Sequence, residues 1–206
     1  MPETINVTRK TAVKVFIDPE GHDPRKWDNL GTMACWHGHY QLGDEQPTIP
    51  PQEYESALPD GVTLPLYLFD HSGITMRTDP TTFQMMDSAG WDWGQVGFIH
   101  CSLERARAET GYGHLNDEEL REKVAMMLID EVEVYDAFLR GAVYGFEVVE
   151  QLIDEEGSVL KEEHIDSCGG FHDTESYSAL EGMYEHVDEK LHALLVEAFD
   201  NPEYLY

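Results

Sequence analysis

The sequence predicts an α+β protein with a largely antiparallel sheet and two long amphipathic helices in its C-terminal half. Short alternating apolar runs separated by glycine- and proline-containing turns dominate the first half, which is typical of strands. Two stretches of the second half repeat their apolar residues every third and fourth position, as helices do. With 206 residues, the chain fits a single domain over 1–206, with a strand-rich half, about 1–103, and an acidic helix and hairpin half, about 104–206.

The first half is expected to contain five strands, at residues 11–17, 30–36, 64–69, 74–77 and 95–101. The first of them stops at the turn Asp18-Pro-Glu-Gly, and the third and fourth flank the tight turn Asp70-His-Ser-Gly73. Residues 44–61 carry four prolines, so we expect a long exposed loop there.

Two helices follow. Ser102 is expected to cap a short helix over 103–110. Asn116 then begins a long helix, because its side chain can accept the first free amides while Glu119 reaches back to the cap. This helix is expected to run to about Leu139, with Gly141 ending it and a single apolar stripe formed by Leu120, Val124, Leu128, Val132 and Tyr135.

The remaining chain is expected to form a hairpin and a final helix. Strands at 143–153 and 158–165 would be joined by the turn Asp154-Glu-Glu-Gly157. The final element, about 174–199, has the apolar spacing of one amphipathic helix packed on a core.

Acidic residues outnumber basic ones by 41 to 13, which gives a formal net charge of −28. Such a field repels nucleic acid and anionic membranes, so direct binding to either is not expected. The charge is uneven: residues 1–103 carry −8, and residues 104–206 carry −20. A concentrated acidic surface favours a cationic partner, whereas salt adaptation of the whole protein would have no reason to favour one half.

The cysteines, the N-terminus and the apolar runs of the sequence indicate the cellular compartment. Cys35, Cys101 and Cys168 are too few and too scattered for a disulfide framework or a CxxC zinc site. The N-terminus lacks the pattern of a secretory signal, and no apolar run approaches the length of a membrane span. We therefore expect a cytoplasmic protein without disulfides.

Several segments together resemble an uncharacterised family of small acidic proteins from bacteriophages, prophages and plasmids. The resemblance covers roughly residues 10–171 and is carried by these segments: Asp28-Asn-Leu-Gly-Thr-Met-Ala-Cys-Trp-His37, Tyr40-Gln-Leu-Gly-Asp44, Leu66-Tyr-Leu-Phe-Asp-His-Ser-Gly-Ile-Thr75, Trp93-Gly-Gln-Val-Gly-Phe-Ile99, Tyr144-Gly-Phe146 and Ser167-Cys-Gly-Gly-Phe171. It implies a mobile-element origin, with the host cytoplasm as location, but no particular activity. The relatives commonly have arginine where this chain has His39, so the resemblance implies no metal site shared by the family.

The most enzyme-like cluster contains histidines. His37 and His39 would share one face of a strand, and His71 in the adjoining turn could complete a metal site, with Asp70 and His100 as further candidates. An HxH pair is a weak signal, and histidines at strand ends more often make ordinary hydrogen bonds. Asp70-His-Ser-Gly73 is better interpreted as a turn than as a triad, because adjacent side chains point apart. No catalytic residue, resident metal or cofactor is therefore assigned.

The acidic surface supplies the candidate binding residues. Glu181, Glu185 and Glu189 are spaced by four, about 6 Å apart on a helix, which is comparable to the step between phosphates. The full set of candidate partner-binding residues is Glu155, Glu156, Glu162, Glu163, Asp166, Glu181, Glu185, Asp188 and Glu189.

The leading hypothesis is a mobile-element binding protein that mimics nucleic acid and inhibits a host defence or nucleic-acid-processing enzyme, of the anti-restriction or anti-CRISPR type. Its partner would be a cationic nucleic-acid-binding protein or complex of the host, and self-association into a homo-oligomer stays open. One alternative is a metal-dependent enzyme or small-ligand binder centred on His37, His39 and His71. Another is a salt-adapted accessory protein whose acidic residues bind nothing in particular.

Overall fold

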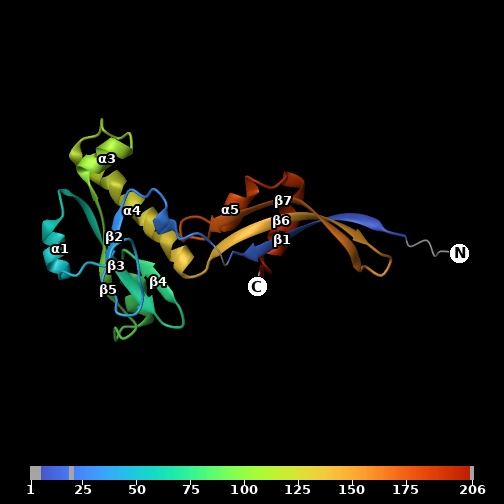
Figure 1. Cartoon of the computed structure of the whole chain (residues 1–206), viewed down its shortest axis with the longest axis horizontal. Coiled ribbons are helices and arrows are strands. Elements are labelled where there is room, and N and C mark those ends of the chain that lie inside the picture. The colour runs from blue at the N-terminus through green and yellow to red at the C-terminus, as the bar shows by residue number, and fades with distance from the viewer. Residues whose placement is uncertain (1–5, 19–20, 205–206) are drawn as a thin grey trace. The chain divides into compact units, whose positions relative to one another are not determined.

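The computed structural model describes residues 6–18 and 21–204 and confirms the α+β class (Figure 1). The chain divides into two compact units, one made of residues 1–22 and 141–206 and the other of residues 23–140. We call them the terminal unit and the central unit. Each unit has its own four-stranded sheet and its own buried core.

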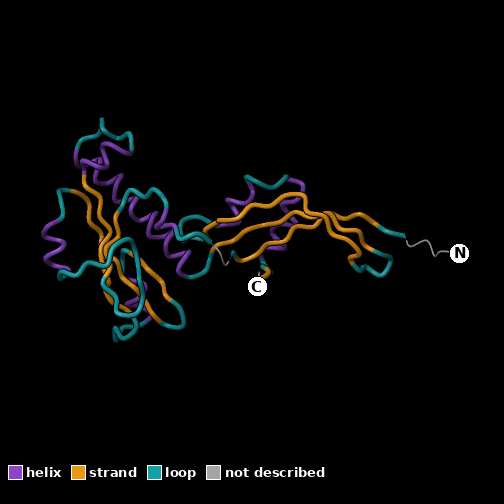
Figure 2. Tube along the Cα trace, in the orientation of Figure 1, coloured by secondary structure: helices purple, strands orange, loops and turns teal. Residues whose placement is uncertain are grey.

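The central unit is built on an antiparallel sheet with the strand order β2-β5-β3-β4. Strands are drawn in orange in Figure 2. The strands are β2 (Thr32–Cys35), β3 (Gly61–Asp70), β4 (Ile74–Arg77) and β5 (Trp93–Ser102). They confirm the four strands expected in this part of the chain. The loop expected at 44–61 contains a short helix, α1 (Pro51–Ala57), which Pro51 is well suited to begin.

The long helix α4 (Asp117–Leu139) supplies the apolar face that covers this sheet. Asn116 and Glu119 form the expected capping box, and the stripe from Leu120 to Tyr135 is buried. The stripe packs on Met33, Leu66 and Ile99 in one core cluster, along with other sheet residues. Two shorter helices complete the unit, α2 (Thr81–Met86) and α3 (Leu103–Glu109), the latter capped by Ser102 as expected.

The terminal unit brings the first strand and the last third of the sequence together. Its sheet has the order β7-β6-β1-β8, with β1 (Thr8–Ile17), β6 (Val143–Ile153), β7 (Val159–His172) and the two-residue β8 (Glu203–Tyr204). β1 and β6 are antiparallel over ten residue pairs, from Thr8↔Ile153 to Ile17↔Tyr144. The expected hairpin of residues 143–165 is confirmed, and its second strand continues to His172.

The final element is not the single helix that the apolar spacing predicts. The structure has α5 (Ala179–Tyr184), a 3₁₀ turn (Glu189–Leu191) and α6 (His192–Phe199). α5 ends at Tyr184, and Asp188 begins the next turn: its backbone is not helical and its side chain accepts a hydrogen bond from the Lys190 N–H. The apolar positions still reach the core: Met183, Val187 and Leu195 are buried against Val15 and Phe146.

Candidate cation-binding surface

All nine candidate acidic residues belong to the terminal unit, and all nine are exposed. Five lie on the hairpin: Glu155 and Glu156 in the turn, and Glu162, Glu163 and Asp166 on β7. The other four follow the sheet, around α5 and the 3₁₀ turn. Seventeen acidic and two basic residues occur between 141 and 206, so this region has little cationic compensation of its own.

The hairpin carboxylates do not share one face of the sheet. Glu162 accepts a hydrogen bond from the Lys14 ammonium and another, at 2.8 Å, from the Gln151 amide. The Lys14 ammonium and this amide hold the pKa of Glu162 below its usual range. On β1, Lys14 lies opposite Glu147 of β6, and its neighbour Val13 lies opposite Val148. Val148 in turn lies opposite Asp166 of β7, so Asp166 is in register with Val13 and not with Lys14. Since side chains alternate along a strand, Asp166 lies on the face opposite to Glu162.

The outer part of β7 is an exposed edge. Residues 159–167 are all exposed, including the apolar side chains of Val159, Leu160 and Ile165. β7 is an edge strand of its sheet, so the backbone N–H and C=O groups on its outer side have no neighbouring strand in the described part of the chain. Three register shifts in its pairing with β6 and the charges of Lys161, Glu162 and Glu163 oppose edge-to-edge aggregation.

The second acidic cluster is not a row on one helix. Glu181 lies in the first turn of α5, Glu185 caps its C-terminal end, and Asp188 and Glu189 begin the 3₁₀ turn. The expected helical spacing therefore holds for Glu181 and Glu185 but is wrong for the step from Glu185 to Glu189. Within the described ranges, Glu181, Glu185 and Glu189 make no ion pair with a basic side chain.

The two clusters meet at a groove of about 420 Å³. Asp166 of β7 and Asp188 before the 3₁₀ turn both line it, together with Glu150 of β6. Its apolar lining comes from Val148, Ile165, Val187 and Leu191. Lys190 and His186 also line the groove, and the Lys190 ammonium lies 3.9 Å from an Asp188 oxygen. Apolar floor and acidic rim together suit a cation carried on an apolar stem.

The histidines of the alternative site lie in the central unit but do not assemble as metal ligands. His37 Nδ1 accepts hydrogen bonds from the backbone N–H groups of His39 and Tyr40, so this nitrogen is engaged by the chain itself. His71 Nδ1 lies 2.8 Å from Asp92 Oδ2. In the part of the chain that the structure describes, no three His, Cys, Asp or Glu side chains are placed to hold a metal ion together.

The turn interpretation of Asp70-His-Ser-Gly73 agrees with the backbone. The His71 N–H donates to the Gly73 carbonyl at 3.0 Å, and Ser72 has a φ of 59°.

The cysteines are free thiols. Burial raises the pKa of Cys35 to about 12 and also raises the pKa of Cys101, so neither is a ready nucleophile.

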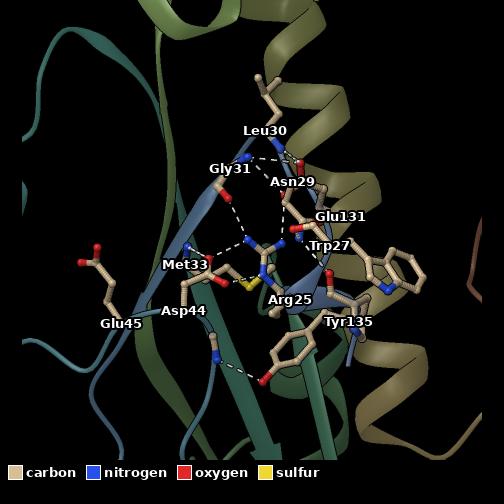
Figure 3. Close-up of polar contacts among 12 residues, drawn as sticks. Arg25, Trp27, Asn29, Leu30, Gly31, Met33, Asp44, Glu45, Glu131 and Tyr135 are labelled. Atoms are coloured by element: carbon tan, nitrogen blue, oxygen red, sulfur yellow. Dashed lines mark hydrogen bonds and ion pairs between the residues drawn. The ribbon is translucent and has the colours of Figure 1, made fainter. Parts of the chain in front are cut away.

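Sequence reasoning missed a buried ionic cluster around Arg25 (Figure 3). The Arg25 guanidinium, 1% exposed, donates to Asp44, to Glu131 and, at 2.7 Å, to the Gly31 carbonyl. Asp44 also accepts from the Met33 N–H at 2.7 Å, and Glu131 accepts from the N–H groups of Leu30 and Gly31. All three nitrogens of the guanidinium thus donate within the protein, which makes the cluster a structural clamp between α4 and two loops.

Two glycines beside this clamp are constrained by packing or by backbone conformation. A Cβ on Gly31 would lie 2.5 Å from Leu128 Cδ2, so any larger residue there would force the core side chains to shift. Gly43 has a φ of +67°, and its N–H donates to the Tyr135 hydroxyl. The motifs around residues 28–37 and 40–44 therefore contain residues that hold the central unit together. In the sequence, the only signal for this role is the Gly43-Asp44 segment together with Arg25.

No family model, curated protein or solved structure matches this chain. None of the helices in the described segments combines the length and the apolar character needed to cross a membrane.

Proposed function

We propose that this chain is an acidic binding protein of mobile-element origin that occupies the basic cleft of a nucleic-acid-processing protein. Its carboxylates take the place of phosphates, and binding blocks the cleft without catalysis, as in an inhibitor of a restriction or CRISPR system. The observation that carries the proposal is the exposure of all nine candidate carboxylates on one unit, four of which surround α5 and the 3₁₀ turn.

Electrostatics support a cationic partner for this unit. Exposed carboxylates without basic neighbours raise the local negative potential, which attracts a basic cleft and accelerates association. Two of the ion pairs that do form, Lys161 with Glu163 at 3.7 Å and Lys190 with Asp188 at 3.9 Å, are exposed and weak. Water-exposed charges of this kind can change partners at little cost, so the surface is ready to pair with lysine and arginine side chains.

The exposed apolar side chains beside the carboxylates support a protein partner over simple ion binding. Ile165, 58% exposed, lies next to Asp166, and Leu160, 52% exposed, lies next to Lys161. Interfaces combine such apolar contacts with a charged rim, whereas a purely electrostatic surface would have no need of them.

The test is an affinity capture from a bacterial lysate at low and at high salt, followed by mass spectrometry. We expect one nucleic-acid-processing complex to be retained at low salt and lost as salt rises. The triple variant Glu181→Lys, Glu185→Lys, Glu189→Lys should lose it while keeping its circular dichroism spectrum.

The matched control reverses three exposed carboxylates of the central unit, Glu53→Lys, Glu55→Lys and Glu122→Lys, and changes the net charge by the same amount. It should still retain the complex. Equal loss in both triple variants would show that only net charge matters, and retention by both would show that this surface is not the binding site.

A further inference from the structure

The central unit contains a second pocket, of about 290 Å³. None of the nine candidate acidic residues lines it. It is bordered by three aromatic rings, those of His37, Trp91 and Trp93, and by the carboxylates of Asp70 and Asp92. Leu68, Gly94 and Val96 of the sheet also line it. A pocket of this size lies at the lower end of the range for small-molecule sites, so it suits a single chemical group.

Trp91 is held in an exposed position by its own loop. Its side chain is 87% exposed, whereas tryptophan is normally buried on average. Asp87 accepts hydrogen bonds from the backbone N–H groups of Trp91 and Asp92, at 2.5 and 2.9 Å, and its carbonyl accepts from the Trp93 indole at 2.9 Å. These bonds present the Trp91 ring without packing it, which is the arrangement of a binding residue and not of a core residue.

The other two rings are also fixed. His37 stacks on Tyr40 with the ring centroids 5.0 Å apart, and Nδ1 accepts two backbone hydrogen bonds. The Trp93 ring meets Tyr67 edge-on at 6.3 Å. The rings of His37 and Trp93 are therefore preorganised, which reduces the entropy lost when a ligand binds.

The charge of the pocket selects a cation. Two carboxylates line it, and none of the residues lining it is lysine or arginine. Both carboxylates already have partners: Asp70 accepts from the Tyr40 hydroxyl at 3.3 Å, and Asp92 is paired with His71 at 2.8 Å. One contact occupies only part of each carboxylate, so both still bring negative charge to the pocket, and the other side chains that line it are aromatic or aliphatic.

We propose that this pocket binds a methylated ammonium group, held by cation–π contacts with Trp91 and Trp93 and by the charge of Asp70 and Asp92. A quaternary ammonium is charged and is attracted by the faces of aromatic rings, so it matches a pocket that combines Trp91 and Trp93 with two carboxylates. The same chemistry occurs in free choline, in a trimethyllysine side chain and in a choline lipid headgroup. The site is independent of the acidic surface of the terminal unit.

The experiment titrates the protein with choline chloride by calorimetry and repeats the titration with 3,3-dimethyl-1-butanol, the neutral isostere. Choline should bind saturably with a Kd below about 10 mM, and the alcohol at least about threefold more weakly, because only choline gains the cation–π attraction. Absence of saturation by choline, or equal binding of the alcohol, would overturn the proposal.

Two variants locate the site. Trp91→Ala removes an exposed ring and should weaken choline binding about 3- to 30-fold. Gly94→Val fills the pocket: a Cβ there meets nothing within 4 Å, and valine suits a strand, so the fold should persist while binding is lost. Met85→Ala, which changes another exposed apolar side chain outside the pocket, is the control and should bind normally. Unchanged binding by Gly94→Val would place choline elsewhere and refute the assignment.

The source of the group is distinguished by two further arms. A peptide with trimethyllysine is compared with the same peptide carrying unmodified lysine, and phosphatidylcholine vesicles are compared with phosphatidylglycerol vesicles. Preference for either methylated partner, lost in Trp91→Ala, identifies the source, whereas tighter binding of unmodified lysine would overturn the proposal.

Discussion

Arg25 and Asp44 are joined by two parallel hydrogen bonds, Nε to Oδ1 at 3.1 Å and Nη2 to Oδ2 at 2.7 Å. The two residues are 19 positions apart in the sequence. The Arg25 guanidinium also donates a hydrogen bond, from Nη1, to Glu131 of α4. This clamp positions the loop before β2 and the loop after it against the long helix. The central unit is therefore held by a polar cluster as well as by its apolar core.

Replacing Arg25 should be strongly destabilising. Arg25→Met leaves Asp44 and Glu131 without their shared counter-charge in a largely buried place, which costs about 3–5 kcal/mol. Urea unfolding measures the loss. Arg9→Ala is the control, because the Arg9 side chain is 70% exposed beside Glu150 and should cost at most about 1 kcal/mol. Equal losses in the two variants would contradict the structural role of the clamp.

Gly31 should tolerate no side chain. In Gly31→Ala the new methyl group would meet Leu128 and Ile99 at 2.5 and 2.7 Å, so side chains of the core must shift at a cost of about 1–3 kcal/mol. Gly38→Ala is the matched control, since its Cβ meets nothing within 4 Å. Thermal unfolding should show a lower Tm for the first variant only; similar Tm values for both would argue against close packing at Gly31.

His100 should make the stability of the protein fall on acidification. Burial lowers the pKa of His100 in the folded state, so below about pH 6.5 the unfolded chain takes up the proton first. The stability that depends on neutral His100 is present above this pH and is lost as the pH falls toward the lowered pKa. Urea unfolding at pH 7.5 and 5.5 should show a larger loss for the native protein than for His100→Gln. Parallel losses would mean that His100 does not titrate differently in the two states.

Salt should stabilise the protein modestly. The net charge of −28 implies repulsion among carboxylates in the folded state, and raising NaCl from 0.01 to about 0.15 M shortens the screening length from about 30 to about 8 Å. We expect the free energy of unfolding to rise by on the order of 1 kcal/mol. A protein that folds only in molar salt would instead support the salt-adaptation alternative.

The acidic candidates illustrate how far pattern alone could go. The nine carboxylates chosen from the sequence are exposed, as charged side chains usually are. The regular spacing of Glu181, Glu185 and Glu189 is broken before Glu189, because the backbone of Asp188 is not helical and its side chain caps a new 3₁₀ turn. Periodicity cannot weigh such a side-chain bond against one more helical turn.

The sequence by itself determined the local elements of this protein. The Asn116–Glu119 capping box, the buried stripe of α4 and the hairpin turn at 154–157 depend on neighbours a few residues apart, so their chemistry is visible in the sequence.

Only the tertiary structure decided which distant segments meet. The pairing of β1 with β6, the Arg25 clamp to Glu131 and the pocket between His37 and Trp91 join residues about 50 to 145 positions apart. Such contacts depend on how whole faces pack and on where buried charge is compensated, and no short-range pattern encodes these energies.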